Sequence, residues 1–408
     1  MRTVTKCAWL VGVYLASGAP YGIVNKAARV YLARLGTGPE EIGRITGWAL
    51  LAYALKFLWA PLLDRVGRRQ HWAAGCQMAV ALLLFVLAGS GPSALGLLLI
   101  ALAACSATLD VAADAYSIEM LEPRELGIAN GIRVTAYKGG YLLTAGLLVG
   151  LADGWGWPGV FRAAGFAMGA LSIVTLLLPR VPKGTATGLP LVEPLRRFIA
   201  RDGLLSFVAV ALFILLFKIG DFAMAPMIEP FLVKRGLTNA QIGYFQTTAG
   251  VIATVLGAMS GGALTTRWGI FRALWILGLF QALSNLGYAA AAATDSPTLL
   301  WSAVVFEPFC GGLGTAAFLA FLMACCGRSH TGTGYALLSA LFGLAGSLAA
   351  FPSGEWVRAW GYGPYFAFTT LLAAPAFALL PWVRRWTPPE PRVSDPLVRG
   401  ANPPDPLD

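Results

Sequence analysis

Apolar stretches of about 20 residues recur along nearly the whole chain, and this feature constrains the fold more than any other. A helix of about 20 residues spans the ~30 Å hydrocarbon core of a bilayer and satisfies its own backbone hydrogen bonds there. Only 12% of the residues are charged, which is well below the ~25% of soluble domains. The sequence therefore predicts an all-α, multi-pass membrane protein.

We count twelve such stretches in the 408 residues. Their ranges are 9–32, 42–62, 72–90, 94–118, 127–151, 158–179, 204–230, 240–264, 270–293, 298–325, 333–357 and 363–383. Gly and Pro occur inside several of them, which packed membrane helices tolerate. The chain is therefore expected to form twelve transmembrane helices.

Lys and Arg are unevenly distributed among the connecting loops. The loops "DRVGRRQH", "PRVPKG", "TTRWGIFR" and "RRW" follow even-numbered helices, whereas "GSGPS", "ADGWGWP" and "ATDSPT" contain neither residue. Positively charged loops tend to stay in the cytoplasm, so both termini are predicted to be cytoplasmic. This bias also explains the net charge of +10, and no nucleic-acid partner is needed.

The first half of the sequence is repeated in the second half. "YLARLGTGPEEIG" at 31–43 aligns at an offset of 200 with "FLVKRGLTNAQIG" at 231–243, and "APLLDRVGRRQ" at 60–70 aligns with "GALTTRWGIFR" at 262–272. The repeat predicts two parallel halves of six helices each.

The repeat and the polar segments together predict the domain boundaries. We expect an N-terminal six-helix bundle over 1–182, a cytoplasmic linker over 183–203, a C-terminal six-helix bundle over 204–386 and a disordered cytoplasmic tail over 387–408.

This architecture is similar to that of the major facilitator superfamily. "APLLDRVGRR" resembles the superfamily motif Gly-x-x-x-Asp-Arg-x-Gly-Arg-Arg, with Ala60 in place of the first Gly. The resemblance implies transport by alternating access. A gating latch at the cytoplasmic face would be formed by Asp64, Arg65, Arg68 and Arg69. The alternative is that these charges only set the topology.

Several further segments resemble the AmpG-type muropeptide permeases, which share a family with the acetyl-coenzyme A transporters. They include "LDVAADAYSIEMLEPRELG", "LFKIGDFAMA", "QALSNLGY" and "YALLSALFG". The resemblance implies a secondary active transporter of the bacterial inner membrane that imports an anhydromuropeptide or a related amphipathic solute. The main alternative is a ferric-siderophore importer or another uptake permease of the family, and the alternative outside transport is a membrane sensor.

Two carboxylates lie four residues apart inside the fourth predicted helix. Asp110 and Asp114 share one face of that helix, and Lys138 on the fifth helix is expected at a similar depth. Intramembrane charges are costly unless they face protein or water. The pair could share a proton or form an ion pair with the lysine, so a proton-coupling role and a structural network are both open.

In the superfamily, helices 1, 4, 7 and 10 line the central cavity, and the resemblance implies that charges on these helices face it. The proton-coupling candidates are Asp110, Asp114, Asp221 and Glu307. The substrate-cavity candidates are Lys26, Arg29, Tyr116, Lys138 and Lys218. Away from the cavity, we expect Lys56 to pair locally and Glu355 to pair with Arg358.

The sequence contains no phosphate-binding glycine loop, no metal-ligand spacing and no catalytic cluster. We therefore expect a protein that is not an enzyme and that needs no cofactor or metal. Concentrative uptake must then draw on an ion gradient, most simply a proton gradient. The expected partners are a small solute, a proton and the lipid bilayer, and the protein is expected to be a monomer.

Overall fold

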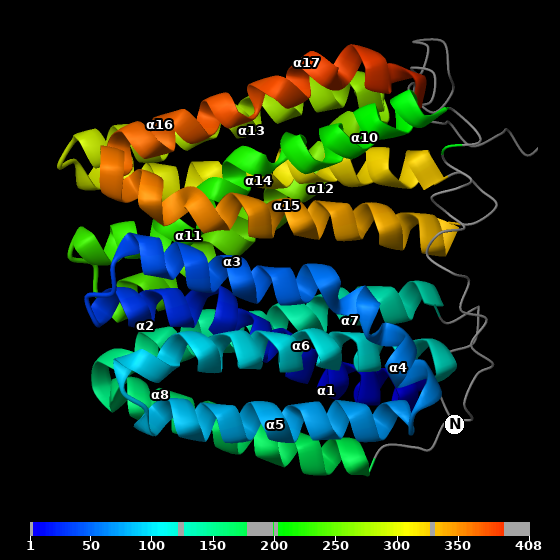
Figure 1. Ribbon diagram of the computed structural model, residues 1–408, viewed down its shortest axis with the longest axis vertical. Coiled ribbons are helices and arrows are strands. Elements are labelled where there is room, and N and C mark those ends of the chain that lie inside the picture. Colours follow the sequence, from blue (N-terminus) through cyan, green and yellow to red (C-terminus); the bar gives the residue numbers. More distant parts are fainter. Residues whose placement is uncertain (1–2, 121–125, 178–198, 200–202, 327–330, 387–408) are drawn as a thin grey trace, which may run out of the picture. The chain divides into compact units, whose positions relative to one another are not determined.

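The computed structural model describes residues 3–120, 126–177, 199, 203–326 and 331–386 (Figure 1). Within these residues every regular element is a helix, and each of the twelve predicted ranges contains helix. Eight spans in the described part of the chain are long and apolar enough to cross a membrane, and one of them, Ile132–Leu176, covers two predicted helices. The prediction of an all-α membrane fold is confirmed.

The helices of the first half are often interrupted. In chain order they are α1 (Thr3–Gly22), η1 (Ile23–Ala27), α2 (Ala28–Arg34), α3 (Pro39–Leu55), η2 (Lys56–Leu58), α4 (Ala60–Arg65), α5 (Arg69–Gly89), α6 (Pro92–Met120), α7 (Leu126–Tyr141), η4 (Leu142–Leu148) and α8 (Val149–Leu176). The segments η1 and η4 are π-helical, and η2 is a 3-10 turn.

The second half follows the same scheme. Its elements are α10 (Leu204–Phe217), α11 (Ile219–Lys234), the π-helical η5 (Gln241–Thr247), α12 (Thr248–Trp268), α13 (Ile270–Ala293), α14 (Pro297–Cys326), α15 (Thr331–Trp360), α16 (Tyr362–Leu372), α17 (Ala374–Val383) and η6 (Arg384–Trp386).

Two interruptions have clear sequence causes. Helix α4 begins at Ala60–Pro61, and proline is accommodated in the first turn of a helix but not in its interior, so the chain breaks at η2. Inside α8, Gly156 has φ 68° and ψ 160° just before Pro158. The fifth predicted helix turns into the sixth at this point.

The aligned repeat segments have the same backbone conformation. Gly36 and Gly236 have φ of 76° and 80°, and Gly67 and Gly269 have φ of 70° and 83°. Each follows the end of a helix, where a left-handed residue closes the last turn and glycine adopts that conformation without strain. The structure thus supports the repeat read from the sequence.

Contacts divide the chain into two compact units. Unit 1 comprises 1–190, 222–249 and 340–365, and unit 2 comprises 191–221, 250–339 and 366–408. In unit 1, α1 packs on α7, and α5 packs on α6 and α8. In unit 2, α13 packs on α14, and α10 packs on α17. The predicted division into six-helix halves is based on the sequence repeat and stays a prediction, and most of the linker and the whole tail lie outside the described residues.

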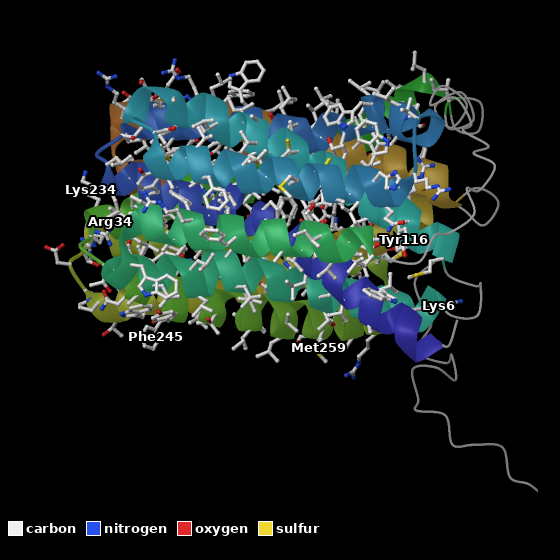
Figure 2. The ribbon with its side chains drawn as sticks, turned by 90° about the horizontal axis from the view of Figure 1, so that it is seen from below. Lys6, Arg34, Tyr116, Lys234, Phe245 and Met259 are labelled. Carbon is white, nitrogen blue, oxygen red and sulfur yellow. The ribbon has the colours of Figure 1, made fainter. Side chains whose placement is uncertain are left out.

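Many large apolar side chains point away from the helices. Figure 2 shows this for Phe245 and Met259, which are 63% and 70% exposed. So much exposed apolar surface suits lipid rather than water. Several charged side chains are buried all the same, among them Lys26, Arg29, Lys218 and Glu229.

Candidate functional site

A cavity of about 240 Å³ lies beside the two carboxylates of α6. Its walls come from α1, η2, α6 and α7 of unit 1. The lining residues are Tyr14, Ser17, Lys56, Asp110, Asp114, Arg133, Val134, Tyr137 and Lys138. Because Asp110 and Asp114 are one helical turn apart, α6 presents both to the same space.

Asp110 accepts bonds from two neighbouring helices. The Ser17 hydroxyl of α1 donates to its Oδ1, and Lys56 Nζ lies 3.5 Å from its Oδ2. The Asp110 side chain is only 12% exposed, so the lysine supplies the positive charge that a buried carboxylate needs. Lys56 starts the 3-10 turn η2, and it pairs with Asp110 of another helix rather than locally as the sequence suggested.

Asp114 has an equivalent set of partners, and its site is more open. The Tyr14 hydroxyl of α1 donates to Oδ1 at 2.9 Å, and Arg133 Nη2 of α7 lies 3.3 Å from the same oxygen. The side chains of Asp114 and Arg133 are 35% and 46% exposed. Each carboxylate is therefore matched by one hydroxyl group and one cation.

Lys138 lines the cavity as predicted, but it does not pair with either carboxylate. Its Nζ lies 5.7 Å from the ring centroid of Tyr141 instead. The cations that pair with the two carboxylates are Lys56 and Arg133, neither of which the sequence connects with the acids. These pairs are 54 and 19 residues apart in the sequence and depend on helix packing, which no local spacing reveals.

Tyrosine rings cluster beside the cavity. The ring of Tyr21 lies 5.2 Å from that of Tyr53, 5.8 Å from that of Tyr137 and 6.2 Å from that of Tyr141, measured between centroids. Tyr137 also lines the cavity. The cluster provides aromatic faces and hydroxyl groups next to the charged residues.

Tyr116, a substrate-cavity candidate, is not among the residues that line this cavity. It is 2% exposed and lies in an apolar core with Leu10, Val13, Tyr14 and Met120. It follows Asp114 by two residues, so it lies on a different face of α6. In the structure its role is packing of α1 and α7 against α6.

Lys26 and Arg29 lie in a buried ion-paired cluster. Lys26 Nζ is 3.4 Å from Glu229 Oε1, and Arg29 Nε is 3.3 Å from Glu229 Oε2. Lys26 also donates to the Gln246 side chain, and Arg29 Nη1 donates to the Ala225 carbonyl at 2.7 Å. The three charged side chains are 5–11% exposed. They tie η1 and α2 to α11 and η5 within unit 1.

In unit 2, Lys218 and Asp221 are joined as their i, i+3 spacing suggested. Lys218 Nζ lies 3.0 Å from Asp221 Oδ2, and it also donates to the Gly311 carbonyl and the Thr315 hydroxyl of α14. A Cβ atom built on Gly311 would be 3.8 Å from Glu307 Oε1 and 3.9 Å from Asp221 Oδ2. The candidate carboxylates of α11 and α14 therefore face the same small region.

The predicted latch is only partly visible. The side chains of Asp64 and Arg65 lie outside the described residues. Arg68 is exposed, and Arg69 is buried and donates to the Leu63 carbonyl. The latch stays a prediction.

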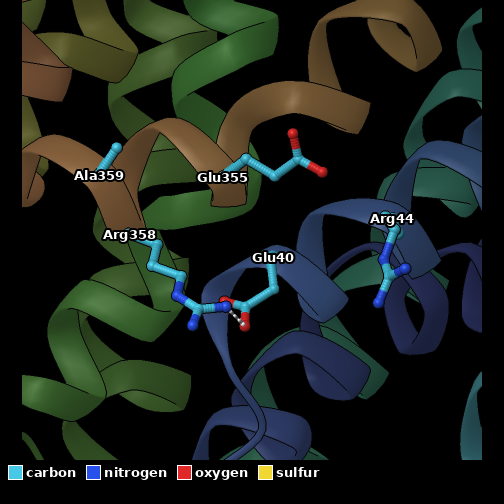
Figure 3. Close-up of a pocket in the computed structure, with 5 residues that line it drawn as sticks. All are labelled: Glu40, Arg44, Glu355, Arg358 and Ala359. Carbon is cyan, nitrogen blue, oxygen red and sulfur yellow. Dashed lines mark hydrogen bonds and ion pairs between the residues drawn. The ribbon is translucent and has the colours of Figure 1, made fainter.

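A second, more open pocket of about 630 Å³ lies between α3 and α15 in unit 1 (Figure 3). It is lined by Glu40, Arg44, Glu355, Arg358 and Ala359. Arg358 Nη1 lies 2.9 Å from Glu40 Oε1. The expected pairing of Arg358 with Glu355 was wrong, because Figure 3 shows the Arg358 side chain directed to α3 while Glu355 points away from it.

No group of three or more His, Cys, Asp or Glu side chains among the described residues is arranged to hold a metal ion. The chemistry of the cavity is that of carboxylates, cations and phenol groups. Such groups can exchange protons and can bind polar solutes by charge and hydrogen bonding.

Comparison with protein families and curated relatives gives consistent matches over most of the chain. Residues 10–350 match the family model described as Major Facilitator Superfamily. The anhydromuropeptide permease of Escherichia coli K12 is 33% identical over 401 residues, covering 94% of this chain and 80% of that protein. A putative transporter AmpG 4 of Rickettsia felis is 28% identical over 397 residues, covering 91% of this chain and 94% of that protein.

Solved structures agree with this fold. A bacterial homolog of the human lysosomal transporter Spinster, in an inward-facing and unoccupied conformation, matches with a TM-score of 0.78 and 17% identity, covering 94% of this chain and 97% of that one. The nucleoside transporter NupG matches with a TM-score of 0.68 and 13% identity, covering 95% of this chain and 99% of that one. At these identities the likeness concerns the fold alone.

Proposed function

This chain belongs to the major facilitator superfamily and is related to the anhydromuropeptide permeases, and from that premise we propose that it imports an anhydromuropeptide or a related amphipathic solute by proton symport. Proteins of this superfamily are transporters and not enzymes. The proposed site of action is the bacterial inner membrane, and the proposed mechanism is alternating access.

The observation that carries the proton-coupling proposal is the pair of matched carboxylates in one cavity. Asp110 and Asp114 lie in a membrane span, and each is held by one cation and one hydroxyl group. The cations come from other helices, so a relative movement of η2 or α7 would separate charge pairs. A carboxylate that loses its cation binds a proton more readily, and this couples proton binding to helix movement.

The proposal for the cargo is supported by the relatives and by the chemistry of the cavity. The E. coli relative is an anhydromuropeptide permease by name. Tyrosine rings and cations beside the cavity suit a solute that combines sugar rings with acidic groups. The second candidate function is uptake of a ferric siderophore or of another solute that permeases of the same family carry. The third is a membrane sensor that binds its solute without transporting it.

The test of coupling uses the purified protein in proteoliposomes. Uptake of a radiolabelled anhydromuropeptide driven by a pH gradient is compared with exchange at equal pH, in the parent and in Asp110→Asn and Asp114→Asn. We expect at least one variant to lose gradient-driven accumulation and keep exchange. Asp295→Asn, in an exposed loop, is the matched control and should behave like the parent.

If both variants accumulate the cargo as the parent does, the carboxylates form a structural network and the coupling proposal fails. Parallel uptake assays with ferric siderophores decide between the cargo classes. Binding of a solute without counterflow would support the sensor alternative.

A further inference from the structure

The charges that line the α6 cavity do not balance. Three cations, Lys56, Arg133 and Lys138, face two carboxylates, Asp110 and Asp114. Each carboxylate is paired with one of the first two cations. Within the described residues, the only partner of Lys138 is the Tyr141 ring, and its side chain is exposed.

An unmatched cation at this place needs an explanation. Lys138 belongs to the apolar span Ile132–Leu176, and ionisable residues in such spans are costly unless they meet water or an opposite charge. Lys138 is exposed, so its ammonium group remains available to an incoming anion. A lysine ammonium carries three N–H donors and binds anionic oxygens as a point charge.

Arg133 also has unused binding capacity. Its Nη2 faces Asp114, and its guanidinium lies 5.4 Å from the ring centroid of Tyr14. A guanidinium has five N–H donors, and the side chain is 46% exposed, so several donors remain for a ligand. On α7, Arg133 and Lys138 are five residues apart and line the same cavity.

We propose that Lys138, together with Arg133, binds a carboxylate group of the transported solute in the α6 cavity. This inference rests on the proposed function. A volume of about 240 Å³ is below the range of roughly 300–1,000 Å³ for pockets that enclose a drug-sized ligand. The cavity therefore accepts one acidic group of a larger solute, with the ring of Tyr137 beside it.

The binding step also connects the cargo with the coupling residues. A carboxylate bound to the remaining N–H donors of Arg133 shares the positive charge that otherwise stabilises only Asp114. Binding of the cargo then weakens the hold of Arg133 on Asp114, and a carboxylate without its cation partner binds a proton more readily. The acidic group of the cargo thus favours loading of the proton.

The test compares two forms of one probe, 1,6-anhydro-N-acetylmuramic acid and its methyl ester, which differ in a single negative charge. Their Kd values are measured by calorimetry on the full chain in phosphatidylcholine nanodiscs. A charge-assisted bond is worth about 1.5–3 kcal/mol, so the parent should bind the acid roughly ten-fold or more tightly than the ester. Lys138→Gln should lose most of this preference, because only Arg133 still faces the acid, and the Kd of the acid should rise more than the Kd of the ester. Lys138→Arg should keep the preference.

Lys234→Gln is the matched control, because Lys234 also lies over a tyrosine ring, 5.3 Å from that of Tyr362, and does not line the cavity. It should keep the preference for the acid. Equal affinity of the parent for acid and ester would overturn the inference and leave the proposed function intact, and so would an equal loss of both affinities in Lys138→Gln. If the parent binds and transports neither form, the proposed cargo is wrong and the inference fails with it.

The phosphate group of an anionic lipid has charge chemistry that also fits Lys138 and Arg133. The lipid composition of the nanodiscs distinguishes a lipid headgroup from the carboxylate of the cargo. The measurement is repeated with phosphatidylglycerol in the bilayer. The proposal expects the same preference for the acid. Loss of the preference in the parent by competition with phosphatidylglycerol would assign the site to a lipid headgroup and overturn the proposal.

Discussion

Glu229 forms ion pairs with two buried cations, Lys26 and Arg29. An unpaired charge in a buried place destabilises the folded protein. Removing one partner of a buried ion pair lowers the free energy of unfolding by about 3–5 kcal/mol. The Nε of Arg29 and one Glu229 oxygen lie within ion-pair distance but make no hydrogen bond, so their attraction depends on low exposure rather than on good geometry. The cluster is thus sensitive to any change in charge.

We therefore predict that Glu229→Gln lowers the thermal stability of the detergent-solubilised protein strongly, because two buried cations lose their counter-charge. Glu41→Gln, which changes an exposed glutamate, should shift Tm little. The combined variant Glu229→Gln with Lys26→Gln should recover part of the loss. A Tm of Glu229→Gln equal to that of Glu41→Gln would contradict the ion-paired account.

The candidate site shows which residues sequence reasoning can identify. Asp110 and Asp114 were found because an i, i+4 spacing inside an apolar span is visible in the sequence. Their cations were not, because the 3-10 turn at Lys56 and the packing of α7 decide which cation reaches which acid. The sequence predicts Lys26 and Arg29 as substrate-cavity residues and this stays a prediction, whereas their burial against Glu229 depends on tertiary contacts that the sequence does not show.

At the scale of helices, close contacts depend on glycines at equivalent repeat positions. Gly43 of α3 lies so close to α15 that a larger residue would crowd it. A Cβ atom at this position would lie 3.0 Å from the Ala350 carbonyl oxygen and the Gly354 nitrogen. Gly243 of η5 packs on the backbone of Gly146 and Gly150 in the same way. The repeat places both glycines at an offset of 200. Small residues let membrane helices approach closely.

We predict that Gly243→Ala destabilises the protein by about 1–3 kcal/mol, as overpacking of a tight contact does. Gly262→Ala is the control, because a Cβ on Gly262 of α12 meets nothing within 4 Å. The midpoint of thermal unfolding and the rate of uptake are measured for both variants. Equal behaviour of the two would mean that the η4–η5 contact does not require glycine.

The loop between α4 and α5 carries the charge motif found in the sequence. Arg69 is buried and bonded to the Leu63 carbonyl, which fixes the turn. We predict that Asp64→Asn slows transport at least several-fold while expression stays normal, because the latch of alternating access loses its anion. Initial uptake rates in proteoliposomes test this. Normal rates would reduce the motif to a topology signal.

At the scale of the whole molecule, hydropathy and the repeat predicted the fold. Membrane helices must satisfy their own backbone, so their number and order follow from the apolar stretches. The interruptions at η1, η4 and η5 were not predicted, because a π-helical turn leaves no mark in hydropathy. Two of these turns, η1 and η5, contribute Lys26 and Gln246 to the buried cluster, so the irregular backbone lies at the contacts between helices.

The central claim is that cargo and protons move together, and proton flux measures it most directly. Anhydromuropeptide is added to proteoliposomes at equal internal and external pH, with the membrane potential clamped, and the external pH is followed with a dye. We predict that the external medium becomes more alkaline as the cargo enters, and that this change is lost in the Asp110→Asn or Asp114→Asn variant that also loses accumulation. Cargo entry without any change in external pH would contradict proton symport.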